Sequence, residues 1–268
     1  MAGLKRSALT ALITGASSGI GAALARCFAR DGHRPVLVAR SAGKLQELAQ
    51  SLHAEFGVRA VVLAADLART GAAATLAAGI KRKRLAIDVL VNNAGILEQG
   101  RFVRIPARRH QALIDLNVTG LTAMLVQFLP PMIRRGHGRV LNVASIAAFQ
   151  PVPMLATYAA TKAYVLSLTE SLSEELRDTG VTVTALCPGI TATHMLTAAA
   201  DANAKLGSLP GFLVSDVDAV AAEGYRACMA GEVIAVPGNV NWATVVAARA
   251  APKWLVRRVV GAIGRNAV

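Results

Sequence analysis

The chain has 268 residues, of which 54% are hydrophobic and 17% charged, so it can build a sizeable core and general disorder is excluded. Its net charge of +13 raises the question of nucleic-acid binding, but the basic residues are spread along the chain and aromatic residues make up only 4%, which argues against that partner. Three distant cysteines (Cys27, Cys187 and Cys228) and five scattered histidines predict neither a disulfide framework nor a metal site, and the cysteines suit a reducing compartment.

The first predicted strand, residues 8–13, ends in a glycine-rich turn. Lys5-Arg6 before it resemble the start of a signal peptide, but the apolar run is too short for one. The turn reads Thr14-Gly15-Ala16-Ser17-Ser18-Gly19-Ile20-Gly21, and helical periodicity follows over 22–31. Glycines let the backbone approach a pyrophosphate, and the free N–H groups of a helix N-terminus attract negative charge. The context therefore favours a dinucleotide site over an ordinary tight turn.

The second predicted strand, residues 35–39, ends in Arg40. An acidic residue near this place binds the ribose hydroxyl in NAD-selective sites, whereas an arginine accommodates a 2′-phosphate. Arg40 therefore favours NADP(H), with NAD(H) as the second choice and a solvated strand-end charge as the alternative. Predicted elements continue with a helix over 43–56, a strand over 60–65 and a helix over 70–83 whose basic end suits a helix C-terminus.

A fourth strand, residues 88–91, leads into Asn92-Asn93-Ala94-Gly95. Strands alternating with helices at this spacing predict βαβ units and a parallel sheet, in which ligands lie beyond the carboxyl ends of the strands. The glycine turn, Arg40, Asp66, Asn93 and Ser145 all follow strands. We therefore expect them along one edge of the sheet.

The segment from Ser145 to Lys162 carries the chemistry. Ser145 directly follows the apolar run 140–144. Tyr158 lies four residues before Lys162 in a predicted helix, so the side chains of Tyr158 and Lys162 share one helical face. A neighbouring fixed cation lowers the pKa of a phenol and makes it usable in proton transfer. The alternative is an amphipathic helix with a half-buried Tyr158 and a solvated Lys162.

Taken in order, these motifs resemble the short-chain dehydrogenase/reductase family. The resemblance covers about residues 7–195 and also includes Asn117 in Leu116-Asn117-Val118-Thr119-Gly120 and Pro188-Gly189-x-x-x-Thr193. It implies an α/β fold, a Rossmann-type doubly wound parallel sheet of about seven strands flanked by helices in an α-β-α sandwich. We expect one catalytic domain, residues 1–250, followed by a tail, 251–268.

The resemblance implies the site residues. Cofactor contacts are expected from Gly15, Ser17, Ser18, Gly19, Ile20, Gly21, Arg40, Asp66, Leu67, Asn93, Ala94, Gly95, Tyr158, Lys162, Pro188, Gly189, Ile190, Thr191 and Thr193. Tyr158 is expected as general acid/base, Ser145 as the partner of the substrate oxygen, and Lys162 as the group that lowers the Tyr158 pKa. Asn117 is expected to anchor a water that links Lys162 to solvent, with a kink in its helix as the structural alternative.

The substrate is expected between residues 146–155 and a segment at about 190–215 that is rich in apolar residues and is predicted to be a lid. Loop packing without ligand contact is the alternative for that segment. The resulting hypothesis is a lipid-like, steroid-like or acyl-chain carbonyl or alcohol. A helix over 216–229 and a strand over 232–236 are predicted to follow.

The tail, residues 251–268, combines Trp254 with apolar and basic residues, which favours an amphipathic helix. It is predicted either to pack over the pocket or another subunit, or to lie on an anionic membrane.

Family members associate through the helices at about 111–135 and 156–179, so a homodimer or homotetramer is expected. The predicted location is cytoplasmic, with membrane-surface contact as an option. Rival functions are a catalytically silent dinucleotide-binding regulator and an epimerase or dehydratase; the complete Ser145, Tyr158, Lys162 set and the glycine spacing argue against them.

Overall fold

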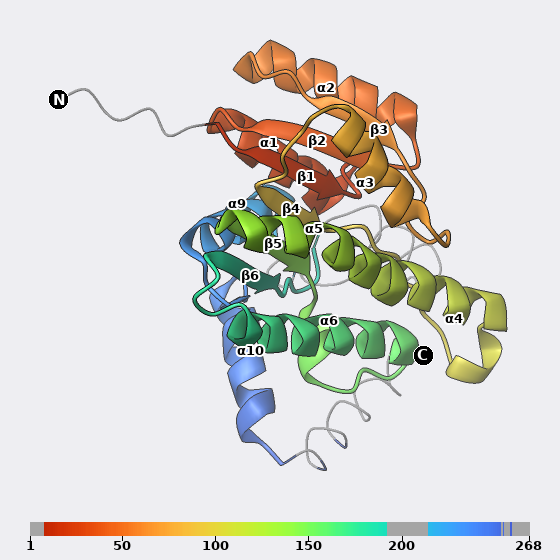
Figure 1. Cartoon of the computed structure of the whole chain (residues 1–268). Helices are drawn as coiled ribbons and strands as arrows, with labels where there is room; N and C mark the ends of the chain where they lie inside the picture. Colours follow the sequence, from red (N-terminus) through yellow and green to blue (C-terminus); the bar gives the residue numbers. More distant parts are fainter. Residues whose placement is uncertain (1–7, 192–213, 253, 255–257, 259–268) are drawn as a thin grey trace.

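The computed structural model describes residues 8–191, 214–252, 254 and 258, which form a seven-stranded sheet with helices on both faces (Figure 1). The strands lie in the order β3-β2-β1-β4-β5-β6-β7, and every neighbouring pair is parallel. Their bounds are β1 Thr10–Thr14, β2 Arg34–Ala39, β3 Val61–Ala64, β4 Val89–Asn92, β5 Gly138–Val143, β6 Val181–Leu186 and β7 Ile234–Ala235. The predicted doubly wound α/β fold is confirmed.

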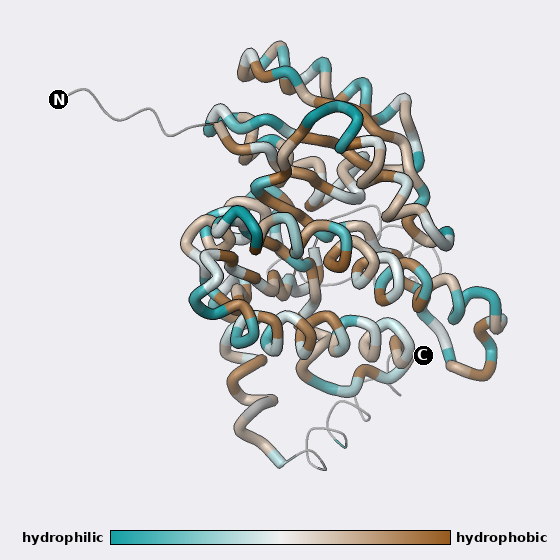
Figure 2. The backbone as a smooth tube through the Cα atoms, in the orientation of Figure 1, coloured by the Kyte–Doolittle hydropathy of each residue, from teal (hydrophilic) through white to brown (hydrophobic). Residues whose placement is uncertain are grey.

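Two hydrophobic cores lie on opposite faces of the sheet. Helices α1 Gly19–Arg30, α2 Ala42–Phe56 and α9 Val217–Ala230 pack in one core, and α3 Ala72–Arg82, α5 Leu121–Arg135 and α6 Ala156–Glu175 pack in the other. Successive strand residues point to opposite faces, so Ala11 and Ile13 of β1 join the first core and Leu12 joins the second. Because both faces are covered, the central strands are nearly continuous apolar runs, brown in Figure 2.

The remaining described elements lie around this sandwich. They are α4 Ala107–Ile114, α10 Asn239–Ala250 and three short helical turns, η1 Phe102–Arg104, η2 Asp115–Gly120 and η3 Ile146–Phe149. The run from Ala107 to Arg135 is long and apolar enough to cross a membrane by length and composition. Met124, Phe128 and Met132 of this run are buried in the second core, so we interpret it as a core helix.

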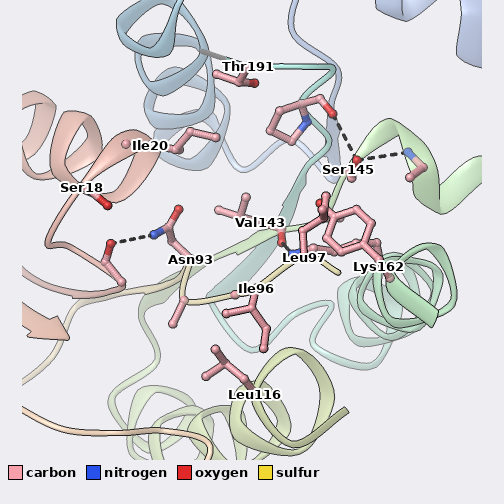
Figure 3. Close-up of a pocket in the computed structure, with 18 of the residues that line it drawn as sticks. Ser18, Ile20, Asn93, Ile96, Leu97, Leu116, Val143, Ser145, Lys162 and Thr191 are labelled. Carbon is pink, nitrogen blue, oxygen red and sulfur yellow. Dashed lines mark hydrogen bonds between the residues drawn. The ribbon is translucent and has the colours of Figure 1, made fainter. Parts of the chain in front are cut away.

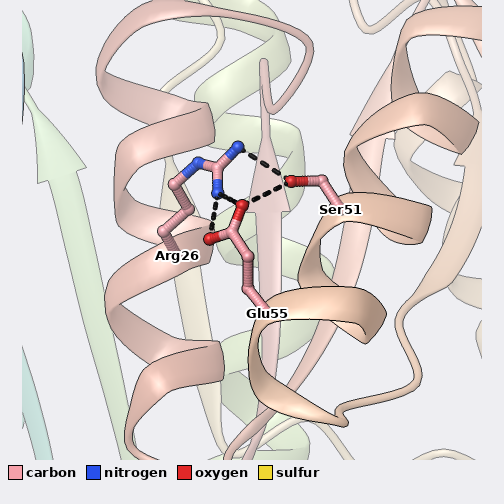
Figure 4. Close-up of polar contacts among 3 residues, drawn as sticks. All are labelled: Arg26, Ser51 and Glu55. Carbon is pink, nitrogen blue, oxygen red and sulfur yellow. Dashed lines mark hydrogen bonds and ion pairs between the residues drawn. The ribbon is translucent and has the colours of Figure 1, made fainter.

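A polar cluster joins α1 to α2 (Figure 4). The Arg26 guanidinium donates to both Glu55 carboxylate oxygens at 2.5 Å and to Ser51 Oγ at 3.0 Å. The Arg26 and Glu55 side chains are 39% and 45% exposed, so solvent screens the pair and its contribution to stability is small. The cluster instead fixes the position of α1, which follows the glycine turn, relative to α2, which follows Arg40.

The strand order reverses between β1 and β4, and this reversal opens a crevice at their carboxyl ends. The glycine turn follows β1, Asn93 follows β4, and Ser145 lies two residues beyond β5. Parallel pairing of β1 with β4 and of β4 with β5 brings these three strand ends to one edge of the sheet. This is the arrangement that the sequence predicted.

The predicted elements differ from the observed ones mainly at their ends. The helix predicted over 156–179 ends at Glu175, because Asp178 and Gly180 adopt left-handed backbone conformations with φ of 68° and 74°. The strand predicted over 232–236 is shortened to Ile234–Ala235, and Pro237 beyond it has no N–H to extend a ladder. The helix predicted from residue 111 begins at Ala107. Strand β6 and helix α10 were not assigned from the sequence.

Candidate active site

A cavity of about 820 Å³ lies at the carboxyl ends of the central strands. Every described residue that the sequence analysis assigned to the site lines it, except Gly21 and Asn117, which lie behind the lining. Thr193 and most of the predicted lid, residues 192–213, lie outside the described residues. The topology therefore brings together five separate stretches of chain: the glycine turn, Arg40, Asn93, Ser145, and the α6 pair Tyr158 and Lys162.

The glycine turn is held by Thr14 and Asn93. Thr14 Oγ1 donates to Val91 O at 3.1 Å and accepts from the N–H groups of Asn93 and Ala94, each at 3.0 Å. Asn93 Nδ2 donates to Thr14 O at 2.9 Å and to Gly15 O at 3.2 Å. One hydroxyl and one amide thus tie the end of β1 to the end of β4. Thr14 was missed as a site residue, although a hydroxyl at the last strand position before the glycine was a usable signal.

The N-terminus of α1 opens onto the cavity. Ser18 precedes the helix in an extended conformation, and its side chain makes no capping hydrogen bond. The first N–H groups of the helix are therefore left for another acceptor, and the helix dipole favours a negative one. Ser17, Ser18 and Gly19 line the cavity at this point, with Ser18 labelled in Figure 3. This geometry fits the pyrophosphate of a dinucleotide.

Two cations line the cavity near the end of β2. Arg40 follows the strand, and Lys44 lies in the first turn of α2. Among the described residues neither forms an ion pair, so both charges are available to a ligand. Lys44 was not predicted, although a second basic residue soon after Arg40 was a usable signal. A paired positive charge at this place fits a ribose 2′-phosphate better than a free hydroxyl.

Ser145 and Tyr158 form the polar centre of the cavity. Ser145 Oγ accepts from Ala147 N at 3.2 Å and lies 3.5 Å from Pro188 O, to which it donates (Figure 3). The Tyr158 side chain comes from the first turn of α6 and is buried. Both side chains line the cavity. Two hydroxyl groups in one cavity can hold one substrate oxygen between them.

Lys162 lies one turn along α6 from Tyr158 and is 6% exposed. Its Nζ donates to Val143 O at 2.8 Å and lies 5.7 Å from the centre of the Tyr158 ring. Burial lowers the pKa of Lys162 from 10.5 to about 8. The ammonium therefore remains charged at neutral pH, but at a cost in folding free energy.

The predicted electrostatics of Tyr158 require a correction. We expected Lys162 to lower the pKa of this phenol, but burial raises the Tyr158 pKa, and only the nearby Ser145 hydroxyl acts in the opposite direction. The lysine is four residues away as predicted, yet its Nζ is hydrogen-bonded to the end of β5. The four-residue spacing correctly predicted that the two side chains lie close together on the helix. It could not predict the desolvation of the Tyr158 hydroxyl, which depends on the residues packed around it.

Asn117 lies in the π-helical turn η2, between α4 and α5. Its side-chain oxygen accepts from Ile96 N at 3.0 Å, and its Nδ2 donates to Ile96 O at 2.9 Å and to Thr161 Oγ1 at 3.2 Å. The side chain therefore links the loop after β4 to α6. The helix irregularity that we named as an alternative is present, and the water-anchoring role of Asn117 stays a prediction.

The far part of the cavity is mostly apolar. Ile96 and Leu97 come from the loop after β4, and Val152 and Leu155 come from the loop before α6. The two loops are joined by a hydrogen bond from Gly100 N to Met154 O at 2.8 Å. Sequence reasoning bracketed the second loop but missed the first. An apolar pair directly after Asn92-Asn93-Ala94-Gly95 was the signal for it.

Replacing Lys162 by methionine should raise the free energy of unfolding at about pH 7 by roughly 1 kcal/mol. The pKa falls from 10.5 to about 8, a fall of about 2.5 that corresponds to about 3 kcal/mol of burial cost. Leaving Val143 O without its donor offsets about 2 kcal/mol of that gain.

Because the folded pKa lies below the unfolded one, the natural chain gains stability as pH rises from about 8 to 10.5. The advantage of the variant should therefore disappear in that window, as measured by urea unfolding at several pH values. Lys81→Met, at an exposed position of α3, is the matched control and should show neither effect. A Lys162→Met variant less stable than the natural chain at neutral pH would contradict the prediction.

The comparisons with known proteins agree with this geometry. The family model described as short chain dehydrogenase matches residues 9–204. Oxidoreductase UcpA from Escherichia coli K12 is 36% identical over 192 residues, covering 71% of this chain and 72% of that protein.

Two solved structures are also similar. A short-chain dehydrogenase from Sphingobium yanoikuyae in complex with NADPH has a TM-score of 0.80 and 36% identity, covering 90% of this chain and 93% of that one. The bulky-bulky ketone specific alcohol dehydrogenase from Comamonas testosteroni has a TM-score of 0.77 and 33% identity, covering 91% and 93%.

Proposed function

The chain belongs to the short-chain dehydrogenase family, and from this premise we propose that it is an NADP(H)-dependent oxidoreductase that interconverts an apolar carbonyl compound and the corresponding alcohol. The observation that carries the proposal is the meeting of Ser145, Tyr158 and Lys162 in the same cavity as the glycine turn. Carbonyl reduction requires a proton donor and a group that binds the substrate oxygen, and this cavity offers both together with a buried cation.

When bound, the nicotinamide supplies or accepts the hydride, and the protein supplies the proton and the orientation. In the reducing direction Ser145 Oγ donates a hydrogen bond to the carbonyl oxygen and Tyr158 transfers its phenolic proton to that oxygen. The phenol carries its proton at neutral pH; burial raises its pKa and so disfavours the phenolate that proton transfer leaves behind. In the oxidising direction Tyr158 accepts the alcohol proton. Lys162, whose Nζ lies 5.7 Å from the centre of the Tyr158 ring, would contact the cofactor beside this phenol.

The cofactor is assigned to residues around the strand ends. Gly15, Ser17, Ser18, Gly19 and Ile20 would hold the phosphates, with Gly21 supporting the turn. Arg40 would bind the 2′-phosphate, and Lys44 joins it in this proposal. The remaining adenosine-side and nicotinamide-side contacts would come from Asp66, Leu67, Asn93, Ala94, Gly95, Pro188, Gly189, Ile190, Thr191 and Thr193. The NADPH complex of the Sphingobium relative supports NADP(H), and NAD(H) is the second choice.

Replacing Arg40 by leucine should raise the KM for NADPH about 30-fold and leave the KM for NADH nearly unchanged. The guanidinium lines the cavity without an ion-pair partner among the described residues, and a charge-assisted hydrogen bond to phosphate contributes about 2 kcal/mol. Steady-state kinetics with each cofactor measures the change. Lys44→Leu should give a smaller change in the same direction, and Lys81→Leu none. An equal loss with NADH and NADPH would sink the assignment of Arg40 to the 2′-phosphate.

The substrate is proposed to be apolar around its carbonyl. Ile96, Leu97, Val152 and Leu155 supply the surface, and the predicted lid at about 190–215 would complete it. The Comamonas relative, specific for bulky-bulky ketones, supports a roomy apolar site. NADPH oxidation over a panel of carbonyl compounds tests the proposal: we expect bulky apolar ketones and aldehydes to have the highest kcat/KM. Preference for small charged carbonyls would overturn this substrate class, and no turnover across the panel would revive the regulatory alternative.

We also propose that the protein is a cytoplasmic homodimer or homotetramer. Val126 and Ile133 of α5 and Tyr164 of α6 are large exposed side chains on the two helices that the sequence analysis assigned to subunit contacts. Of the tail, the structure describes Trp254, which is 55% exposed, with the Arg258 guanidinium 5.8 Å from its ring. Its contact with the pocket, a subunit or a membrane stays a prediction.

A further inference from the structure

The turn η1 presents apolar side chains to solvent between arginines. Phe102 is 60% exposed and Val103 is 85% exposed, the latter a value that neither a core residue nor a packed loop would show. Four exposed arginines surround them: Arg101, Arg104, Arg108 and Arg109. The turn is the yellow loop that leads into α4 at the outer edge of Figure 1, and in Figure 2 a brown stretch there lies next to the teal start of α4.

The charge of this arginine turn, residues 101–109, is largely uncompensated. Among the described residues Arg109 pairs with Glu98 at 3.7 Å, whereas Arg101, Arg104 and Arg108 have no ion pair. A turn that was merely solvated would not need two exposed apolar side chains at its centre. Apolar groups surrounded by free guanidinium groups suit an interface that is apolar at depth and anionic at its surface.

The apolar side chains are held outward by a fixed backbone. His110 Nε2 lies 3.1 Å from Phe102 O, and His110 Nδ1 lies 2.8 Å from Thr157 Oγ1 at the start of α6. The rings of Phe102 and His110 lie 4.4 Å apart. These contacts fix the turn before any partner arrives, which reduces the entropy lost on binding. The same loop carries Ile96 and Leu97 into the cavity wall, so the exposed turn is continuous with the cavity lining.

We propose that the arginine turn docks the protein on an anionic lipid surface, with Phe102 and Val103 at the acyl boundary and the arginines among the headgroups. A second copy of this chain is a poorer occupant, because a symmetric contact would bring two sets of unpaired arginines together. Docking of this kind would place the cavity near the bilayer, where apolar carbonyl compounds partition. That last step rests on the proposed function, whereas vesicle binding can be measured without any turnover.

The test is flotation of the full chain with vesicles of phosphatidylcholine alone and of phosphatidylcholine with about 30% phosphatidylserine, at low and high salt. We expect binding to the anionic vesicles only, weakened by salt. Each basic residue near such a surface contributes a factor of about five to partitioning, so Arg101→Gln/Arg104→Gln should lower binding about 30-fold. Val103→Asp should lower it at least tenfold. Lys81→Gln/Lys83→Gln, at the C-terminal end of α3, removes the same charge elsewhere and should have much less effect.

Three outcomes would overturn the inference. The first is no binding of the natural chain to anionic vesicles. The second is an equal loss in both double variants, which would assign binding to the net charge of the chain. The third is unchanged binding in Val103→Asp together with loss in Trp254→Ser, which would assign it to the tail. NADPH-dependent turnover of a water-soluble substrate, measured on the same variants, keeps failure of docking separate from failure of the oxidoreductase assignment.

Discussion

We expect the Tyr158→Phe variant to reduce carbonyl substrates about 1000-fold more slowly than the natural chain, because general acid catalysis contributes about two to four orders of magnitude. Phenylalanine keeps the ring in its buried position and removes only the phenolic hydroxyl. The loss should therefore fall on kcat rather than on cofactor binding. Stopped-flow reduction of a substrate from the carbonyl panel and NADPH fluorescence titration measure the two quantities separately.

The chain offers a matched control for this substitution. Tyr164 also lies on α6, is 39% exposed, and its hydroxyl lies 2.9 Å from Thr122 Oγ1 instead of in the cavity. Tyr164→Phe makes the same chemical change on the same helix and should leave kcat within about twofold, since surface substitutions have small effects. If Tyr158→Phe turned over at a rate close to that of Tyr164→Phe, proton transfer by Tyr158 would be wrong. If Tyr158→Phe also lost NADPH binding, we would conclude that the substitution had disturbed the folding of the site.

The sequence predicted the position of the site because order along the chain translates directly into position in a parallel sheet. Arg40, Asn93 and Ser145 each follow a predicted strand, and parallel pairing puts the carboxyl ends of those strands at one edge. No side-chain contact had to be known for this step. The parallel sheet and its two covered faces then follow from apolar strands alternating with amphipathic helices, whereas the order of the strands did not follow from the sequence pattern.

What the sequence could not predict depends on packing at the scale of single atoms. The direction of the Tyr158 pKa follows from burial, and that burial is produced by residues distant in sequence such as Leu113 and Ala147. Thr14 was missed because its hydroxyl bonds three backbone groups at the end of β4 and just after it, which is visible only once β1 and β4 are paired. Helix α10 was missed because it follows a two-residue strand with little periodicity to mark the boundary.

The second large effect is expected from Gly21→Ala, which should lower the free energy of unfolding by about 3 kcal/mol and weaken NADPH binding. A Cβ at this position would lie 2.4 Å from Gly15 O and 2.4 Å from Asn93 Nδ2, closer than atoms can approach. Neither neighbour can give way cheaply. Asn93 Nδ2 is bonded to Thr14 O and Gly15 O, so moving it breaks the link between β1 and β4, and moving Gly15 distorts the turn itself.

Gly43→Ala is the matched control, because an added Cβ there meets nothing within 4 Å and the residue lies in α2. It should be neutral or stabilise the protein by up to about 1 kcal/mol, since alanine is the better helix former. Urea unfolding and NADPH titration of both variants make the comparison. A Gly21→Ala protein as stable as Gly43→Ala would show that helix α1 can move away from the turn. If the two variants were equally stable but Gly21→Ala had lost NADPH binding, the glycine turn rather than the helix would have moved to make room for the Cβ. The first result would make the turn the rigid partner in the contact between Gly15 and Gly21, and the second would make it helix α1.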